Sequence, residues 1–165
     1  MLYFKNADSS VQREIEKVLV EEFRKAHQEE FKFDVLDKLG NKKVWLDIEN
    51  DDYIEPDIYS EEHGIVGEIH THIGALKSAQ KHKVSADILK MLTLEKACGK
   101  KLKKYIIVCS EEEKEQLTKS NSHLAFSIKF YNIKVEYYPL TAEHKAMLED
   151  AVKKQNMYGK KLDDE

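Results

Sequence analysis

Residues 55–72, EPDIYSEEHGIVGEIHTH, decide the fold of this sequence. The polar run SEEHG at 60–64 separates two apolar stretches, which is the pattern of an antiparallel hairpin. Because side chains alternate along a strand, Glu68, His70 and His72 are predicted to share one face of the second stretch. The other face is expected to hold three isoleucines: Ile65, Ile69 and Ile73.

Helices and strands are predicted on both sides of this hairpin from the spacing of apolar residues and from turn residues. In chain order they are a helix ending near residue 27, strands 31–37 and 43–49 around a Gly40-Asn41 turn, the hairpin strands 53–59 and 64–72, a helix over 78–98, a strand over 105–109, a helix over 111–131, a strand over 133–138 and a helix over 141–156. A helix between two apolar strands predicts a parallel crossover. The order predicts an α/β fold with a mixed central sheet flanked by helices. We expect one domain over residues 1–158 and a charged, disordered tail over residues 159–165.

Composition narrows the classes of protein that this chain can belong to. Of its 165 residues 41% are hydrophobic and 35% are charged, which is typical of a globular domain. The formal charge of −4 argues against a uniformly basic surface for nucleic acid, although a local basic patch remains possible. No signal peptide or long apolar run stands in the sequence, so a cytoplasmic protein without a membrane partner is expected. A homodimer is left open.

Asp57 and Glu68 are the candidate metal ligands. If the two strands pair so that Asp57 lies opposite Glu68, the carboxylates come within the few ångströms that one hard divalent cation needs. Mg²⁺ or Mn²⁺ suits such oxygen ligands. A cation held there polarises a phosphodiester and lowers the pKa of a bound water, which predicts hydrolysis of nucleic acid.

Pro56-Asp57 followed by Glu68-Ile69-His70, on a β-hairpin between two helices, resembles the motif of the PD-(D/E)XK nuclease superfamily. The resemblance covers most of the chain and implies a restriction-endonuclease-like three-layer fold, a Mg²⁺- or Mn²⁺-dependent endonuclease and DNA as the expected substrate. It also implies a carboxylate from the first helix. Glu16 fits that place best, and Glu14 is the second choice.

The sequence departs from the family motif at one position, because His70 stands where the family has its catalytic lysine. A neutral imidazole accepts a proton or binds a metal but lacks the fixed charge of an ammonium group. We therefore expect a lysine of the following helix to take this role, beside His70. That helix carries a polar stripe of four residues, of which Lys83 is the candidate catalytic residue and Gln80 and Asp87 are supporting residues: Gln80, Lys83, Asp87 and Lys90.

Two other functions stay open. Glu68, His70 and His72, followed by Ser85 and Asp87, resemble the pattern of JAMM-type isopeptidases, in which Zn²⁺ is the cofactor. Loss of the motif lysine would also suit a catalytically degenerate interaction domain on the same fold. The ordinary structural explanation for Asp57 and Glu68 is a charged hairpin edge that discourages aggregation.

Overall fold

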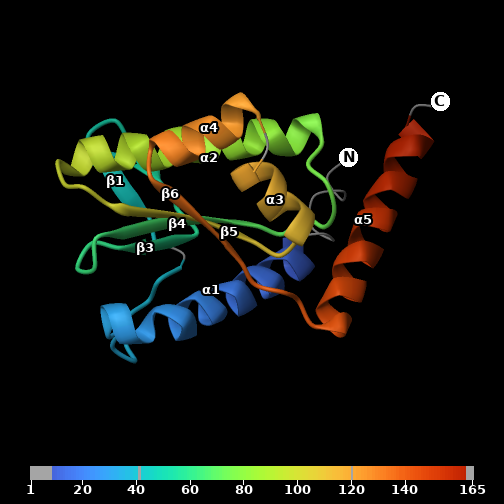
Figure 1. Ribbon diagram of the computed structural model, residues 1–165, viewed down its shortest axis with the longest axis horizontal. Helices are drawn as coiled ribbons and strands as arrows, with labels where there is room; N and C mark the ends of the chain where they lie inside the picture. Colours follow the sequence, from blue (N-terminus) through green and yellow to red (C-terminus); the bar gives the residue numbers. More distant parts are fainter. Residues whose placement is uncertain (1–8, 41, 120, 163–165) are drawn as a thin grey trace.

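A four-stranded mixed sheet forms the centre of the computed structural model, which describes residues 9–40, 42–119 and 121–162 (Figure 1). The strands are β3 (Ile58–Ser60), β4 (Ile65–His70), β5 (Lys103–Val108) and β6 (Ile133–Tyr137), in the spatial order β3-β4-β5-β6. β3 and β4 pair antiparallel, whereas β4, β5 and β6 are parallel. The chain is therefore a mixed α/β protein, as its sequence predicts.

Helices cover both faces of this sheet (Figure 1). On one face lie α2 (Ser78–Cys98), α3 (Glu111–Lys119) and α4 (His123–Phe130). On the other face lie α1 (Ser9–Phe31) and α5 (Ala142–Leu162). Each face has its own apolar core because side chains alternate along the strands. Buried residues of the first core include Tyr59, Val66, Val84, Met91, Leu94 and Ile106. Those of the second include Ile15, Leu19, Phe23, Ile58, Ile65 and Ile69.

The predicted hairpin of residues 55–72 is present, with shorter strands than expected. Ile58 pairs with Gly67 and Ser60 pairs with Ile65. Continuing this register by one residue sets Asp57, just before β3, opposite Glu68. A Cβ at Gly67 would lie only 3.3 Å from the Cβ of Ile58 in β3 and 3.3 Å from the carbonyl oxygen of Tyr105 in β5, so a glycine lets both neighbouring strands lie close to β4 at this point.

Residues 31–37 do not form the predicted strand. α1 continues to Phe31, and Lys32 then takes a left-handed conformation with φ of 51°, which turns the chain. Phe33 is buried but Val35 is 95% exposed, so the alternation of apolar residues reflects an irregular loop and not a sheet face. Of the predicted Gly40-Asn41 turn, Asn41 lies outside the described residues.

The predicted strand 43–49 has a different partner. β1 (Val44–Asp47) pairs antiparallel with β2 (Asp52–Ile54) in a separate two-stranded sheet. Asp47 shapes the intervening turn, since its carboxylate accepts hydrogen bonds from the backbone of Glu49 and Asn50. Residues 53 and 54, assigned from sequence to the hairpin, therefore belong to this small sheet.

The parallel crossover between β5 and β6 is confirmed, but it contains two helices. The predicted helix 111–131 is divided into α3 and α4, and the Ser122 hydroxyl caps α4 by accepting a hydrogen bond from the Ala125 N–H. The helix predicted over 78–98 matches α2, which ends at Gly99 in the left-handed conformation.

The C-terminal segment differs from its prediction. α5 extends to Leu162, so a disordered tail beginning at residue 159 is wrong for residues 159–162, and residues 163–165 lie outside the described part of the chain. Among the helices of the described residues, none has both the length and the apolar character required to cross a bilayer.

Candidate active site

Asp57 and Glu68 stand opposite one another at the open end of the hairpin, in continuation of the β3–β4 register. The Asp57 Oδ2 accepts a hydrogen bond of 2.8 Å from the Ile69 N–H, which fixes the aspartate beside β4. Glu68 is 2% exposed and lies on the α2 side of the sheet, between Val66 and His70 in the alternation of β4. Asp57 accepts its hydrogen bond from β4 through Oδ2, and Glu68 accepts one from Lys90 of α2 through Oε1. The second oxygen of each carboxylate makes no hydrogen bond within the described part of the chain, which leaves it to a cation.

Burial and neighbouring charges shift the pKa of Glu68. Burial, followed by the charge of Asp57, raises the pKa of Glu68 to about 8 against the opposing effect of Lys90. Lys90 offsets only part of this repulsion, and a divalent cation between the two carboxylates would add further positive charge. The donor set is two carboxylates, which are hard oxygen ligands that suit Mg²⁺ or Mn²⁺.

Glu16 joins this pair from α1. Partial burial, followed by the charge of Asp57, raises the pKa of Glu16. The positive charges of Lys83 and Arg13 oppose this shift but do not cancel it. Glu16 and Asp57 also line the same groove. Glu16 and Asp57 are thus neighbours along one groove, and a supporting role of Glu16 in the site stays a prediction.

Lys90 of α2 supplies an ammonium group in direct contact with Glu68. Its Nζ lies 2.9 Å from Oε1 of Glu68 and 3.4 Å from Oδ1 of Asp87. The pKa of Lys90 is raised because its ion pairs outweigh the effect of burial. Lys90 belongs to the polar stripe of α2, of which the sequence pattern favours Lys83 as the catalytic candidate. Lys83 and Lys90 are seven residues apart, two helical turns, so spacing alone places both on one face of the helix.

Lys83 is exposed and lies on α2 two helical turns before Lys90. Its charge lowers the pKa of Glu16, which places it near the α1 side of the site. It lines a second cavity together with His70 and Gln80. Gln80 itself accepts a hydrogen bond of 3.0 Å from the Lys77 N–H, so it caps α2. A direct role of Gln80 in the site is therefore not favoured by its contacts.

His70 is buried between two carboxylates. Its Nε2 lies 2.8 Å from Oδ2 of Asp87 and its Nδ1 lies 2.9 Å from Oε1 of Glu113. Burial opposes protonation, but these two hydrogen bonds outweigh it and raise the pKa of His70 to about 9. Since only an imidazolium donates from both ring nitrogens, His70 is the positive centre of a buried Asp87–His70–Glu113 triad.

Glu113 was missed by sequence reasoning. It is 0% exposed, and its Oε2 is buried without a hydrogen-bond partner among the described residues. The position of Glu113 in the first turn of α3 favours a negative charge there. The sequence offers no motif that pairs Glu113 with His70, because 43 residues separate them.

The residues of the isopeptidase-like pattern occupy different environments. Both ring nitrogens of His70 are hydrogen-bonded to carboxylates, whereas the Nε2 of His72 lies 2.9 Å from the carbonyl oxygen of Ala75. A zinc ion shared by these histidines would have to replace those hydrogen bonds. No contact of Ser85 with this group appears among the described hydrogen bonds, since its hydroxyl donates to the Lys81 carbonyl.

A groove of about 930 Å³ opens beside Asp57 and Glu16. Its wall combines α1 with the loop that follows it, and its charged residues are mixed in sign. The cations are Arg13, Lys17, Arg24, Lys38 and Lys42. Arg24 is engaged with the backbone carbonyls of Asp34 and Asp37, so the other four are the cations available to an anionic ligand. Four acids also line the groove, so its charge is close to balanced in a chain whose net charge is −4: Glu16, Glu21, Asp37 and Asp57.

Comparison with known proteins adds no relative: no family model matches the chain, and no curated protein or solved structure matches it. The resemblance to the PD-(D/E)XK superfamily therefore stays a prediction that depends on the residues described above.

Proposed function

We propose that this protein is a metal-dependent nuclease, or a nuclease-like nucleic-acid-binding protein, with a restriction-endonuclease-like fold. One observation carries the proposal: the buried Glu68, opposed to Asp57, has the Lys90 ammonium 2.9 Å from its carboxylate. Two acids and a cation at the end of a hairpin are the groups that phosphodiester hydrolysis with a divalent ion requires. The arrangement of α1, hairpin, α2 and the parallel strand β5 supports the fold assignment.

Asp57 and Glu68 are the proposed ligands of Mg²⁺ or Mn²⁺. When bound, the ion polarises the phosphodiester and lowers the pKa of a water molecule. Lys90 stabilises the negative charge that develops on the phosphate, the role of the missing motif lysine. Glu16, whose pKa is raised, is the proposed proton acceptor at the groove side.

His70 has a positioning role in this proposal. It holds Asp87 through a hydrogen bond of 2.8 Å, and Asp87 in turn contacts Lys90 at 3.4 Å. His70 thus keeps a positive charge at the position of the motif lysine, while the ammonium group beside Glu68 is that of Lys90 on α2. Lys83, at the exposed end of the same stripe, is a secondary contact for the nucleic-acid backbone.

Nucleic acid, with DNA as the first substrate to test, is the proposed partner because the groove beside Asp57 and Glu16 carries four available cations. Phosphate contacts by lysine and arginine supply most of the sequence-independent affinity for nucleic acid. The acids at the end of the groove would repel phosphate without a metal. We therefore expect binding at the groove to depend on divalent ions as well as on salt.

The test is cleavage of single- and double-stranded DNA and RNA with Mg²⁺ or Mn²⁺, using the wild type, Asp57→Ala and Glu68→Gln. Asp150→Ala is the matched control, because this acid is exposed on α5 and pairs with Lys154. We expect cleavage by the wild type and the control, and loss of at least about 100-fold in the two site variants. Equal cleavage by all four proteins would overturn the assignment of the acids.

A wild type that binds nucleic acid in the groove but cleaves none of the four substrates would favour the second form of the proposal, a nuclease-like nucleic-acid-binding protein without catalytic activity. Binding is measured in parallel by fluorescence anisotropy. A wild type that neither binds nor cleaves would reject both forms.

A further inference from the structure

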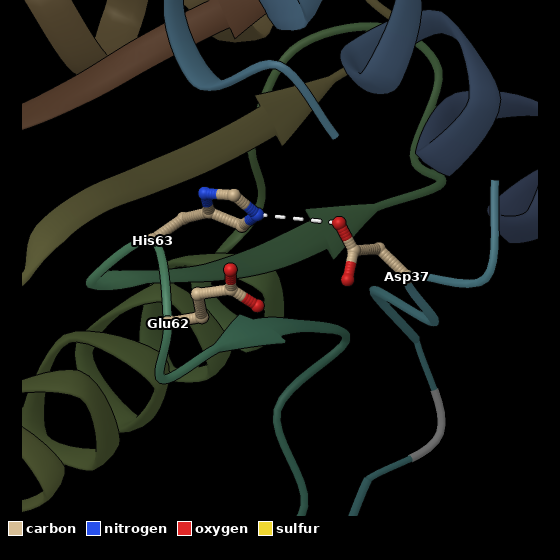
Figure 2. A group of neighbouring side chains, drawn as sticks. All are labelled: Asp37, Glu62 and His63. Atoms are coloured by element: carbon tan, nitrogen blue, oxygen red, sulfur yellow. Dashed lines mark hydrogen bonds and ion pairs between the residues drawn. The ribbon is translucent and has the colours of Figure 1, made fainter. Parts of the chain in front are cut away.

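We propose a second metal site, formed by Asp37, Glu62 and His63, for a first-row transition-metal cation such as Zn²⁺. It is independent of the proposed nuclease function and lies outside the Asp57–Glu68 pair. Figure 2 shows the three side chains directed toward one another, with Asp37 coming from the loop after α1 and the other two from the β3–β4 turn.

The distances fit ligands of one small cation. One ligand atom from each residue lies within 4.8 Å of those of the other two. The His63 Nε2 is 3.2 Å from Oδ2 of Asp37. Two ligands that each lie about 2.0–2.1 Å from a shared ion are about 2.8–3.0 Å apart in octahedral geometry and about 3.3–3.4 Å apart in tetrahedral geometry. The imidazole and one carboxylate are thus already separated by nearly the edge of a coordination polyhedron, so a metal can replace the proton between them.

The imidazole of His63 is held in the orientation that binding requires. Its ring packs edge-on against Phe33, with centroids 5.0 Å apart, and Phe31 lies at 6.1 Å. The backbone N–H of His63 also donates to the Ser60 hydroxyl at 3.3 Å. A ring fixed in this way loses little conformational entropy on binding, which favours affinity.

Asp37 is also fixed in the charged form. Its carboxylate accepts a 2.7 Å hydrogen bond from the Asp34 N–H, and this bond, followed by that of His63, lowers the pKa of Asp37. Arg24 contacts Asp37 through the main-chain carbonyl and not through the carboxylate. Glu62 is exposed, so its carboxylate can turn toward an ion while water completes the shell.

The donor set indicates the class of metal. An imidazole with carboxylates suits Zn²⁺ and its neighbours among the divalent transition metals, whereas Mg²⁺ prefers oxygen ligands alone. Such an ion would join the loop after α1 to the β3–β4 turn. That loop forms part of the groove wall through Asp37, Lys38 and Leu39, so the metal would fix the wall of the groove.

The experiment is titration of untagged, chelator-treated protein with Zn²⁺ against a chromophoric competitor, followed by Co²⁺ absorption spectroscopy. Neither measurement needs catalytic activity. We expect one tight Zn²⁺ in the wild type, at least about tenfold weaker binding in His63→Ala and Asp37→Asn, and a smaller loss in Glu62→Gln. Co²⁺ should give visible d–d bands in the wild type that His63→Ala abolishes.

Two controls separate this site from the rest of the molecule. His82→Ala removes an exposed histidine of α2, and Asp57→Asn removes a ligand of the other proposed metal. Both should bind Zn²⁺ as the wild type does. Because Glu62 is exposed, Glu62→Gln tests the site even if the other variants fold poorly. Wild-type affinity in His63→Ala or in Glu62→Gln, loss of the tight Zn²⁺ in Asp57→Asn, or no wild-type binding tighter than about 100 μM would overturn the proposal.

Discussion

Lys90 and Glu68 form an ion pair of 2.9 Å between α2 and β4, although His70 stands at the motif position two residues after Glu68. The positive charges are thus divided between two elements. His70 is buried between Asp87 and Glu113, whereas Lys90 reaches the acids from the helix with about a third of its side chain exposed. Of these two cations, Lys90 is the one whose side chain is exposed to solvent.

Lys90→Met should lower kcat by about 100- to 1000-fold, because it removes the one ammonium in contact with Glu68 while keeping the length of the side chain. The measurement is cleavage of a labelled oligonucleotide in Mn²⁺. Lys83→Met is the matched control from the same helix face, and it should mainly raise KM. A larger loss of kcat in Lys83→Met than in Lys90→Met would assign the role to Lys83.

His70→Leu should destabilise the protein by about 3–5 kcal/mol, because it leaves the buried Glu113 without a counter-charge and leaves Asp87 with Lys90 alone. Urea unfolding followed by circular dichroism measures the free energy of unfolding. His82→Leu, at an exposed position of α2, should change it by no more than about 0.5 kcal/mol. Similar values for the two variants would show that the triad contributes little to stability.

Stability should fall on the alkaline side of neutrality because of His70. Its pKa is raised to about 9 in the folded protein, above the value of 6.5 for an unperturbed histidine. The contribution is therefore complete below pH 6.5 and is lost as the pH rises toward 9. It amounts to roughly 3 kcal/mol at about 1.4 kcal/mol per pKa unit.

The comparison that isolates this effect is unfolding of the wild type and His70→Gln between pH 6 and 9.5. Glu68, whose pKa is raised to about 8, also lowers wild-type stability as it ionises, but the effect is common to both proteins. The difference between the two proteins should shrink as the pH rises. A difference that stays constant over this range would contradict a protonated His70.

Arg13→Ala combined with Lys17→Ala should weaken binding of nucleic acid by similar factors for all sequences, since both cations line the groove and contacts to phosphate are independent of sequence. The slope of log affinity against log salt should fall by about 1–2. Anisotropy titrations at several salt concentrations measure both. Lys129→Ala with Lys145→Ala, on α4 and α5, removes the same charge outside the groove and should leave the slope nearly unchanged.

Elements with strong periodicity were predictable from sequence, and irregular ones were not. α2 and the parallel strands β5 and β6 follow from their apolar spacing and from Gly99. The strand predicted over 31–37 is absent because Phe31 and Phe33 both pack against the distant His63, and a left-handed Lys32 breaks the apparent alternation. Local pattern carries no information about such contacts.

The same limit applies to the site. The register that sets Asp57 opposite Glu68 follows from the pairing of the two hairpin strands, and Glu16 of α1 lines a groove together with Asp57. The choice between Lys83 and Lys90 depends on how α2 lies across β4, a distance that seven-residue spacing does not encode. Glu113 and the Asp37–Glu62–His63 group come from segments that only the folded chain brings together.

The most direct test of the central claim is an anomalous difference map from crystals soaked in Mn²⁺. We predict a peak about 2.2 Å from carboxylate oxygens of both Asp57 and Glu68, and its disappearance in Glu68→Gln crystals. The proposed metal centre would be contradicted by a map in which Mn²⁺ occupies other sites of the crystal but gives no anomalous peak between Asp57 and Glu68.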